Sequence, residues 1–164
     1  MLNKRQIENL IHNKVVEDYE NGATQLQPAG FDVCVATVST FKNPGRIDFD
    51  NTERKLPELA VVQKFDEHYW FLPQGSYFIT FKELTTIPLN VVVLARPRSS
   101  LLRSGVTVDT GVWDPGYSGR AGSLMIVTNP HGLYLREGAR VIQLIFFPLE
   151  KTTSYKGIYQ DERR

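Results

Sequence analysis

Residues 94–117 read LARPRSSLLRSGVTVDTGVWDPGY, and the rest of the chain is organised around this stretch. Its first half gathers cationic and hydroxyl side chains, namely Arg96, Arg98, Ser99, Ser100 and Arg103. Guanidinium forks and hydroxyls bind phosphate oxygens well, so this turn suits an anionic ligand. An arginine-rich surface turn without a ligand is the competing interpretation, and the local pattern alone does not separate the two.

The second half of the stretch places an acid beside aromatic residues in a glycine-rich turn, Trp113-Asp114-Pro115-Gly116-Tyr117. Such a turn suits a sugar or base and a water molecule. Together the two halves predict a nucleotide site, with polyphosphate at one end and nucleoside at the other. Two purely structural alternatives stay open. Asp114 could cap its own Asp-Pro-Gly turn, and Tyr117 could be a core residue.

Length and charge limit the class of protein. At 164 residues the chain is expected to form one domain, residues 1–164, with its own core. The formal net charge is +1, so there is no global basic field for nucleic acid and any anion site must be local. No apolar window reaches the length of a membrane span and the N-terminus lacks a signal-peptide core, so we expect a cytoplasmic protein that binds no membrane.

The cysteine and histidine content argues against zinc chemistry. Cys34 is the single cysteine, and His12, His68 and His131 are far apart in the sequence. Zinc-dependent nucleobase deaminases need a His/Cys/Cys or Cys₃ ligand set with a Cys-x-x-Cys element. We therefore expect no reaction of that kind.

The spacing of apolar residues predicts an all-β domain with a short N-terminal helix. Leu2, Ile7, Leu10 and Ile11 fall at helical spacing, which predicts a helix over residues 3–13 with Asn3 as its cap. Residues 15–24 are polar and turn-like. The remainder reads as short strands between Pro/Gly turns, without a second helix, which favours a barrel or sandwich.

One acid lies at the start of a predicted strand in the segment LQPAGFDVCV, residues 26–35. Phe31, Val33 and Val35 alternate on one side, so Asp32 lies on the other. Closure of its own turn is the plain interpretation of Asp32.

Four separated motifs now agree in order and spacing: residues 26–35, 98–105, 114–119 and 135–146. In these motifs the chain resembles the dCTP deaminase/dUTPase superfamily, and most of all its archaeal-type dUTPases. The resemblance implies a jelly-roll-like distorted barrel (dUTPase-like, or β-clip). It also implies a homotrimer with active sites at the subunit interfaces, and hydrolysis of dUTP to dUMP and pyrophosphate with Mg²⁺.

The resemblance also implies roles for individual residues. Asp114 would orient and deprotonate the attacking water, and Tyr117 would pack on the deoxyribose. Asp32 would lie near the Mg²⁺-triphosphate, and the uracil would be read by backbone groups of a Val106–Trp113 hairpin. The phosphates would be held by Arg98, Ser99, Ser100 and Gln143, with Arg103 in support.

Residues 151–164 resemble the mobile closing tail of the family, in which a Tyr-x-Gly-x-Tyr-Gln-like segment folds over the triphosphate. Tyr155, Lys156 and Gln160 are the matching residues. This tail departs from the family by lacking the Gly-Ser/Thr stretch that usually follows.

The strand after Asp114 separates the two activities of the superfamily. Metal-free dCTP deaminases carry a glutamate there that shuttles protons, whereas nothing between Asp114 and Glu137 is acidic in this chain. The segment is about two residues longer than the family pattern. Deamination is therefore disfavoured. A metal-free dCTP deaminase, a bifunctional deaminase-dUTPase and a non-catalytic nucleotide-binding relative remain as alternatives.

Overall fold

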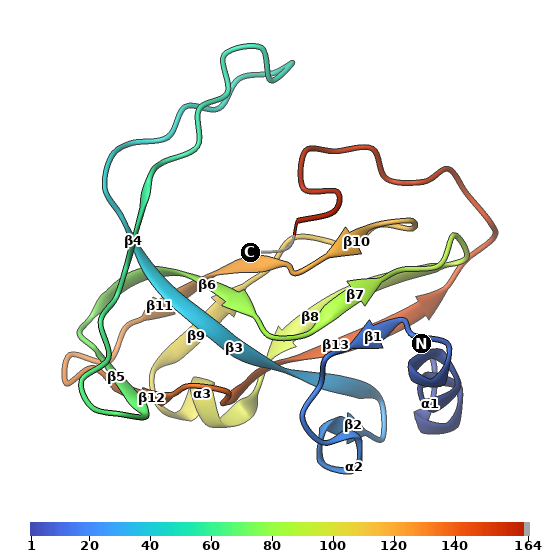
Figure 1. The fold of residues 1–164 in the computed structure, drawn as a ribbon, viewed down its shortest axis with the longest axis horizontal. Coiled ribbons are helices and arrows are strands. Elements are labelled where there is room, and N and C mark those ends of the chain that lie inside the picture. The colour runs from blue at the N-terminus through green and yellow to red at the C-terminus, as the bar shows by residue number, and fades with distance from the viewer. Residues whose placement is uncertain (163–164) are drawn as a thin grey trace.

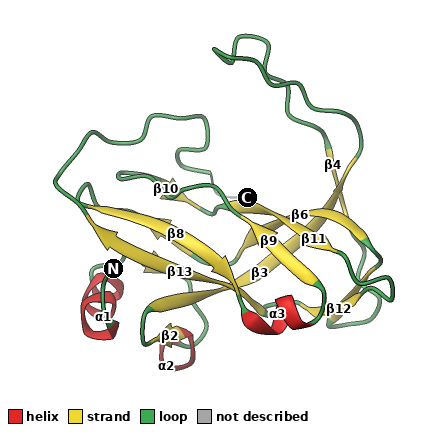
Figure 2. Cartoon of the chain, turned by 180° about the vertical axis from the view of Figure 1, so that it is seen from behind, coloured by secondary structure: helices red, strands yellow, loops and turns green. Residues whose placement is uncertain are grey.

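The computed structural model describes residues 1–162 and forms an antiparallel β-barrel-like body with three short helices on its outside (Figures 1 and 2). The elements in chain order are α1 (Lys4–His12), β1 (Val16–Glu17), α2 (Gly22–Gln25), β2 (Leu26–Gln27), β3 (Gly30–Phe41), β4 (Leu59–Val61), β5 (Tyr69–Leu72), β6 (Gly75–Phe81), β7 (Leu84–Thr86), β8 (Val91–Pro97), α3 (Ser99–Arg103), β9 (Val106–Asp109), β10 (Ser118–Gly119), β11 (Gly122–Val127), β12 (Leu133–Arg136) and β13 (Arg140–Pro148).

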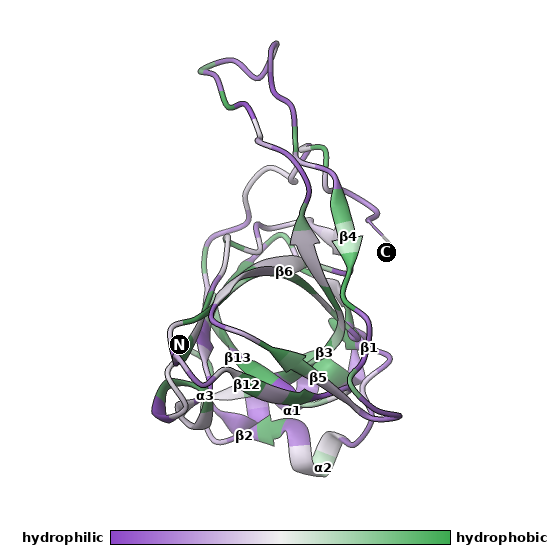
Figure 3. Cartoon of the chain, turned by 90° about the vertical axis from the view of Figure 1, so that its left-hand side faces the viewer, coloured by the Kyte–Doolittle hydropathy of each residue, from purple (hydrophilic) through white to green (hydrophobic). Residues whose placement is uncertain are grey.

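The main sheet runs in the order β8-β13-β3-β6-β11-β9, with β2 and β4 paired to β3. Two smaller sheets, β1-β7-β10 and β12-β5, complete the body. Figure 3 looks along the barrel, whose interior is filled by buried apolar side chains of the surrounding strands, among them Val35, Ile79, Met125 and Leu144. The predicted all-β, jelly-roll-like barrel is confirmed.

The long strand β3 joins the two halves of the main sheet. Its first half pairs with β13, where Asp32 lies opposite Gln143, and its second half pairs with β6, where Val38 lies opposite Ile79. The register shifts between Val35 and Thr37, which marks a bulge where the strand changes partners. The acid that the sequence placed at the start of a strand therefore lies in the middle of a sheet.

The N-terminal helix forms where the sequence predicts it. Asn3 and Gln6 exchange side chain-to-backbone hydrogen bonds of 3.1 and 3.0 Å in a capping box, and Ile7 and Ile11 are buried. The expectation of no further helix was wrong, because α2 and α3 are single helical turns. Such short turns leave no periodic pattern in the sequence.

Candidate nucleotide site

The 111–117 loop lines a pocket of about 380 Å³ beside the barrel. Asp114 and Tyr117 contribute to it from this loop, and Tyr155, Tyr159 and Glu162 contribute from the C-terminal tail. A pocket of this size lies within the range of small-molecule sites in proteins. The structure therefore brings two residues predicted for the nucleoside end, Asp114 and Tyr117, together with Tyr155 of the predicted closing tail.

The turn at Asp114 is closed by the backbone. The Tyr117 amide donates to the Asp114 carbonyl oxygen at 3.1 Å, and Gly116 has a φ of 80°, as expected at the third position of a type II turn. A Cβ atom on Gly116 would also lie 2.8 Å from the Ser154 Cβ, so this position requires glycine. Within residues 1–162 the Asp114 carboxylate accepts no hydrogen bond, and the side chain is exposed. The Asp114 carboxylate therefore does not cap its own turn.

Tyr117 forms the apolar side of this pocket. It is 7% exposed and meets Tyr155 edge to face, with ring centroids 5.8 Å apart. Burial raises the pKa of the Tyr117 hydroxyl, so the phenol stays neutral across the physiological range. A buried neutral ring beside an exposed carboxylate suits a sugar against the ring and a water against the acid.

The tail packs against the same turn. The Tyr155 amide donates to the Pro115 carbonyl oxygen at 2.8 Å, and the Gln160 Nε2 donates to the Gly116 carbonyl oxygen at 3.1 Å. The Gln160 Oε1 accepts from the Ser118 amide at 3.3 Å, so this side chain spans the turn. Lys156 is exposed. The last two residues of the predicted tail, 163–164, lie outside the described residues.

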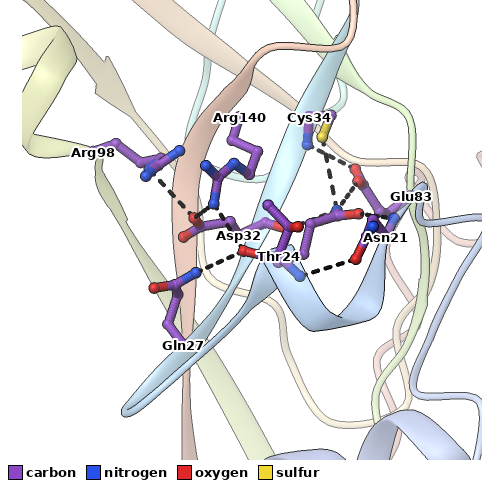
Figure 4. Close-up of polar contacts among 9 residues, drawn as sticks. Asn21, Thr24, Gln27, Asp32, Cys34, Glu83, Arg98 and Arg140 are labelled. Atoms are coloured by element: carbon purple, nitrogen blue, oxygen red, sulfur yellow. Dashed lines mark hydrogen bonds and ion pairs between the residues drawn. The ribbon is translucent and has the colours of Figure 1, made fainter.

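A second group of predicted residues gathers around Asp32, which is 2% exposed (Figure 4). Its Oδ2 lies 3.3 Å from the Arg98 Nε and 3.1 Å from an Arg140 Nη atom. Burial raises the pKa of Asp32, and the two guanidinium groups oppose that effect. Asp32 therefore anchors two arginines instead of closing its own turn, and Arg140 is a partner that the sequence interpretation missed.

A buried carboxylate, Glu83, which lies between β6 and β7, supports this cluster through Gln25 of α2. Gln25 Nε2 donates to Glu83 Oε1 at 2.7 Å and to the Asp32 carbonyl oxygen at 3.0 Å, and the Cys34 amide donates to Glu83 Oε2 at 2.9 Å. Arg140 donates to the Thr24 carbonyl oxygen at 2.8 Å as well as to Asp32. Figure 4 shows these contacts on both sides of Asp32 along β3. No sequence pattern points to Glu83, because its partners Gln25 and Cys34 are distant in the chain.

Gln143 and Arg96 extend the cluster across the sheet. In the register of β3, β13 and β8, Gln143 lies opposite both Asp32 and Arg96, and directly opposed side chains share one face. Gly30 makes room for Gln143, because a Cβ atom there would lie 2.6 Å from the Gln143 Cγ. Ser99, Ser100 and Arg103 follow on α3, where all three are exposed.

The two groups of residues do not meet within one chain. Neither the residues around Asp32 nor those of α3 line the pocket that contains Asp114. In Figure 1, α3 lies at the lower edge of the body, whereas β10 and the tail lie at the upper edge.

The expected Val106–Trp113 hairpin was wrong. Residues 106–109 form β9, which pairs with β11, and Trp113 forms a bridge back to Val93 of β8. The intervening residues 110–112 form a loop, in which Gly111, a residue without a side chain, and Val112 line the pocket.

Residues 1–162 contain no cluster of three or more His, Cys, Asp or Glu side chains placed to hold a metal ion. None of their helices is long and apolar enough to cross a membrane.

Comparison with known proteins gives consistent matches. Residues 1–149 match the family described as dCTP deaminase-like. A probable deoxyuridine 5'-triphosphate nucleotidohydrolase of Methanosarcina mazei is 38% identical, over 99% of this chain and 97% of that protein.

Among solved structures, the 2'-deoxycytidine 5'-triphosphate deaminase of Agrobacterium tumefaciens superposes with a TM-score of 0.65 at 20% identity. That match covers 88% of this chain and 45% of the deaminase chain. The EIAV dUTPase superposes with a TM-score of 0.53 at 17% identity, over 87% of this chain and 94% of its own. These likenesses extend to the fold, and the sequence matches show that this chain belongs to the dCTP deaminase-like family.

Proposed function

We propose that this protein is a dUTP diphosphatase, which hydrolyses dUTP to dUMP and pyrophosphate. The observation that carries the proposal is Asp114, an exposed carboxylate in a nucleoside-sized pocket whose own turn is closed without it. The name of the Methanosarcina mazei relative, which matches along almost its whole length, supports the same activity.

Asp114 is the general base of this reaction. It orients a water molecule and takes its proton as the water oxygen bonds to the phosphorus nearest the nucleoside. The bond from that phosphorus to the pyrophosphate oxygen breaks, and pyrophosphate leaves with the electron pair. Assistance of this kind is typically worth about 10² to 10⁴ in rate.

Tyr117 and the 110–112 loop position the nucleoside. The Tyr117 ring, which is buried, packs on the deoxyribose and selects against a ribose 2′-hydroxyl in this proposal. Backbone groups of Gly111 and Val112 read the uracil.

The phosphates are held by the Asp32 end of the molecule. Arg98, Ser99, Ser100 and Gln143 bind phosphate oxygens, Arg103 supports them from α3, and Tyr155, Lys156 and Gln160 close over the substrate. Asp32 would be the carboxylate that holds the Mg²⁺ of the triphosphate, through water, since its side chain is 2% exposed. Mg²⁺ in phosphate-transfer sites is held by one or two carboxylates plus the substrate phosphates. A single carboxylate fits that pattern here, because both arginine contacts of Asp32 fall on its Oδ2 atom. Bound there, Mg²⁺ would neutralise charge on the triphosphate.

The separation of the two ends supports an assembled site. A chain that carries Asp114 on one side and Arg98 on another completes the site only if the pocket of one copy meets the arginines of the next. We therefore include a cytoplasmic homotrimer, with active sites at the subunit interfaces, in the proposal. The proposal includes neither nucleic acid nor membrane as a partner, and the net charge of +1 gives no global basic field for nucleic acid.

Deamination of dCTP is the second candidate, favoured by one observation. Strand β11 supplies no glutamate, but Glu162 of the tail lines the same pocket as Asp114. A proton-shuttling acid needs only to reach the base, whichever segment carries it.

Product analysis separates the candidates. The full-length protein is incubated with dUTP or dCTP, with Mg²⁺ or with a chelator, and pyrophosphate and ammonia are measured. We expect Mg²⁺-dependent pyrophosphate from dUTP and no ammonia from dCTP. Ammonia release from dCTP that disappears in Glu162→Gln would establish the second candidate, and absence of both products would leave a non-catalytic relative.

A further inference from the structure

A protruding arm, residues 42–58, leaves the barrel between β3 and β4 (Figures 1 and 3). Its outer part is exposed, and Phe49 is fully exposed. At its base the arm reaches the pocket that contains Asp114. Four apolar residues there line the pocket and are called the arm root, namely Leu56 and Pro57 of the arm and the flanking Phe41 of β3 and Leu59 of β4. The mechanism described so far gives these apolar side chains no role.

The root is held in place by backbone pairing. Phe41 lies opposite Leu59 in the β3–β4 register, and the Lys42 amide donates to the Glu58 carbonyl oxygen at 2.9 Å. The Glu58 amide in turn donates to the Asn43 side chain at 2.9 Å. Farther out, the backbones of Arg46 and Lys55 exchange hydrogen bonds of 2.7 and 2.9 Å. The apolar side chains at the root thus project from a paired ribbon.

The rest of the pocket differs in chemistry from this wall. Gly111 and Val112 line it from the 110–112 loop, beside Asp114. Phe78 and Gly122 line it from the sheet, and Gly122 fits closely, because a Cβ atom there would lie 2.8 Å from a Phe78 ring atom. At Gly111 the pocket is therefore lined by backbone atoms, whereas the arm root lines it with apolar side chains.

A uracil ring has the same asymmetry. Its O2, N3–H and O4 atoms make one polar edge, whereas C5 and C6 make an edge of carbon and hydrogen. Polar groups in a pocket must be paired, and apolar edges gain by contact with apolar walls. The polar edge accordingly matches the 110–112 backbone, and the C5–C6 edge matches the arm root.

We propose that the arm root is the wall that sets base selectivity, with Phe41 and Leu56 contacting the C5–C6 edge of the pyrimidine. This inference rests on the proposed function, because it takes the Asp114 pocket as the nucleoside site. Phe41 and Leu56 are 41% and 43% exposed, so each has surface left for a ligand to cover. A methyl group at C5 has to enter the space that these two side chains occupy.

The test compares Leu56→Ala and Phe41→Leu with the control Phe49→Ala in the full-length protein. Phe49 belongs to the same arm but does not line the pocket. The kcat/KM values for dUTP and for dTTP, its 5-methyl analogue, are measured, and the affinities of dUMP and dTMP are measured by calorimetry. One added methylene in an apolar pocket typically changes discrimination by about 10- to 200-fold.

We expect Leu56→Ala to raise KM for dUTP about tenfold with kcat nearly retained, and to shift kcat/KM toward dTTP by about tenfold or more. The dUMP and dTMP affinities should shift in the same direction, and Phe49→Ala should match the parent. If Leu56→Ala fails to fold, Phe41→Leu decides by the same measurements.

Unchanged selectivity in the folded wall variants would overturn the inference while leaving dUTP hydrolysis intact. If the parent protein hydrolyses no dUTP, only the proposed function is contradicted. The relative affinities of the wall variants for dUMP and dTMP then decide whether the arm root sets base selectivity. A parent that binds neither nucleotide overturns both.

Discussion

Asp114 and Asp32 are two carboxylates of one chain in opposite surroundings. Asp114 is exposed at a pocket and accepts no hydrogen bond within residues 1–162, whereas Asp32 is buried and lies within 3.3 Å of two arginines. A base must be free to take a proton, while a buried charge must be paired to be tolerated. The difference shows that one acid suits chemistry and the other suits the placement of cations.

Asp114→Asn should produce the largest change in activity. The amide keeps the shape of the side chain but cannot take a proton from water, so kcat for dUTP should fall by about 10² to 10⁴. The melting temperature should stay near that of the parent, because the backbone closes the turn. Steady-state kinetics and calorimetry measure both quantities. A variant within about twofold of the parent rate would remove Asp114 from the mechanism, and Asp32 and Asp109 would be the next acids to test.

Asp32→Asn should lower the stability of the fold, whereas Asp114→Asn should lower the rate of hydrolysis. The change leaves Arg98 and Arg140 without their shared counter-charge, and breaking a buried pair costs about 3–5 kcal/mol. Because both arginine side chains are 29% exposed, solvent screens them and we expect a loss nearer about 2 kcal/mol. Urea unfolding gives this value, with Asp114→Asn as the matched control. Equal stability of the two variants would contradict the comparison.

Arg98→Ala should weaken triphosphate binding at the Asp32 end. Hydrogen bonds to charged groups are worth about 1.5–3 kcal/mol, so kcat/KM for dUTP should fall by about 10- to 100-fold. Arg98→Lys is the control, because it keeps the charge and loses the two-pronged geometry, and it should recover part of the loss. If kcat/KM is unchanged in Arg98→Ala, α3 is only an arginine-rich surface turn.

Removal of residues 155–164 should affect the pocket end more than the fold. The deletion takes away Tyr155 and Gln160, which hold the 115–118 turn, and the bridge from Glu162 to Gly119 of β10. The strand pairs within the three sheets do not involve the deleted residues. We expect kcat to fall by about tenfold or more, with a small change in melting temperature. A chain that ends at Glu162 serves as the control. Full activity of the longer deletion would show that the tail does not close the site.

The reactivity of the Cys34 thiol reports on the burial of the Asp32 end, and it is the smallest effect that we predict. It lies on β3 beside the Asp32 cluster, and burial next to Glu83 raises the pKa of its thiol to about 12. The thiolate is the reactive form, so iodoacetamide at pH 8 should leave the native protein unmodified and label it only after unfolding. Mass spectrometry follows the reaction. Rapid labelling of the folded protein would mean that the Asp32 end is open to solvent.

The sequence predicts the parts of this molecule that depend on neighbours in the chain. The cap at Asn3 and the turn at Pro115-Gly116 follow from local spacing, and both are present in the structure. The strand predicted over residues 31–35 is present as well, but these residues are buried on both of its faces. Motif order was enough to predict the family and the barrel.

Contacts between distant segments could not be predicted in this way. Arg140 reaches Asp32 across 108 positions, and Glu83 reaches Cys34 across 49, with no pattern linking them. The pocket wall at Leu56 was missed for the same reason, because only the folded arm root places it near Asp114. The roles of the site residues in substrate binding and catalysis stay predictions until they are measured.

The pairing of β3 with β13 has a consequence for synthesis of the protein. Residues 31–34 emerge from the ribosome long before residues 140–144, their partners, have been made. During that interval the first half of β3 offers unpaired backbone groups and the apolar side chains of Phe31 and Val33 to its surroundings. Productive folding has to wait for the end of translation, because long-range strand pairs form late. A nascent chain stalled before residue 140 therefore leaves the β13-facing edge of this strand open to aggregation and to chaperone capture.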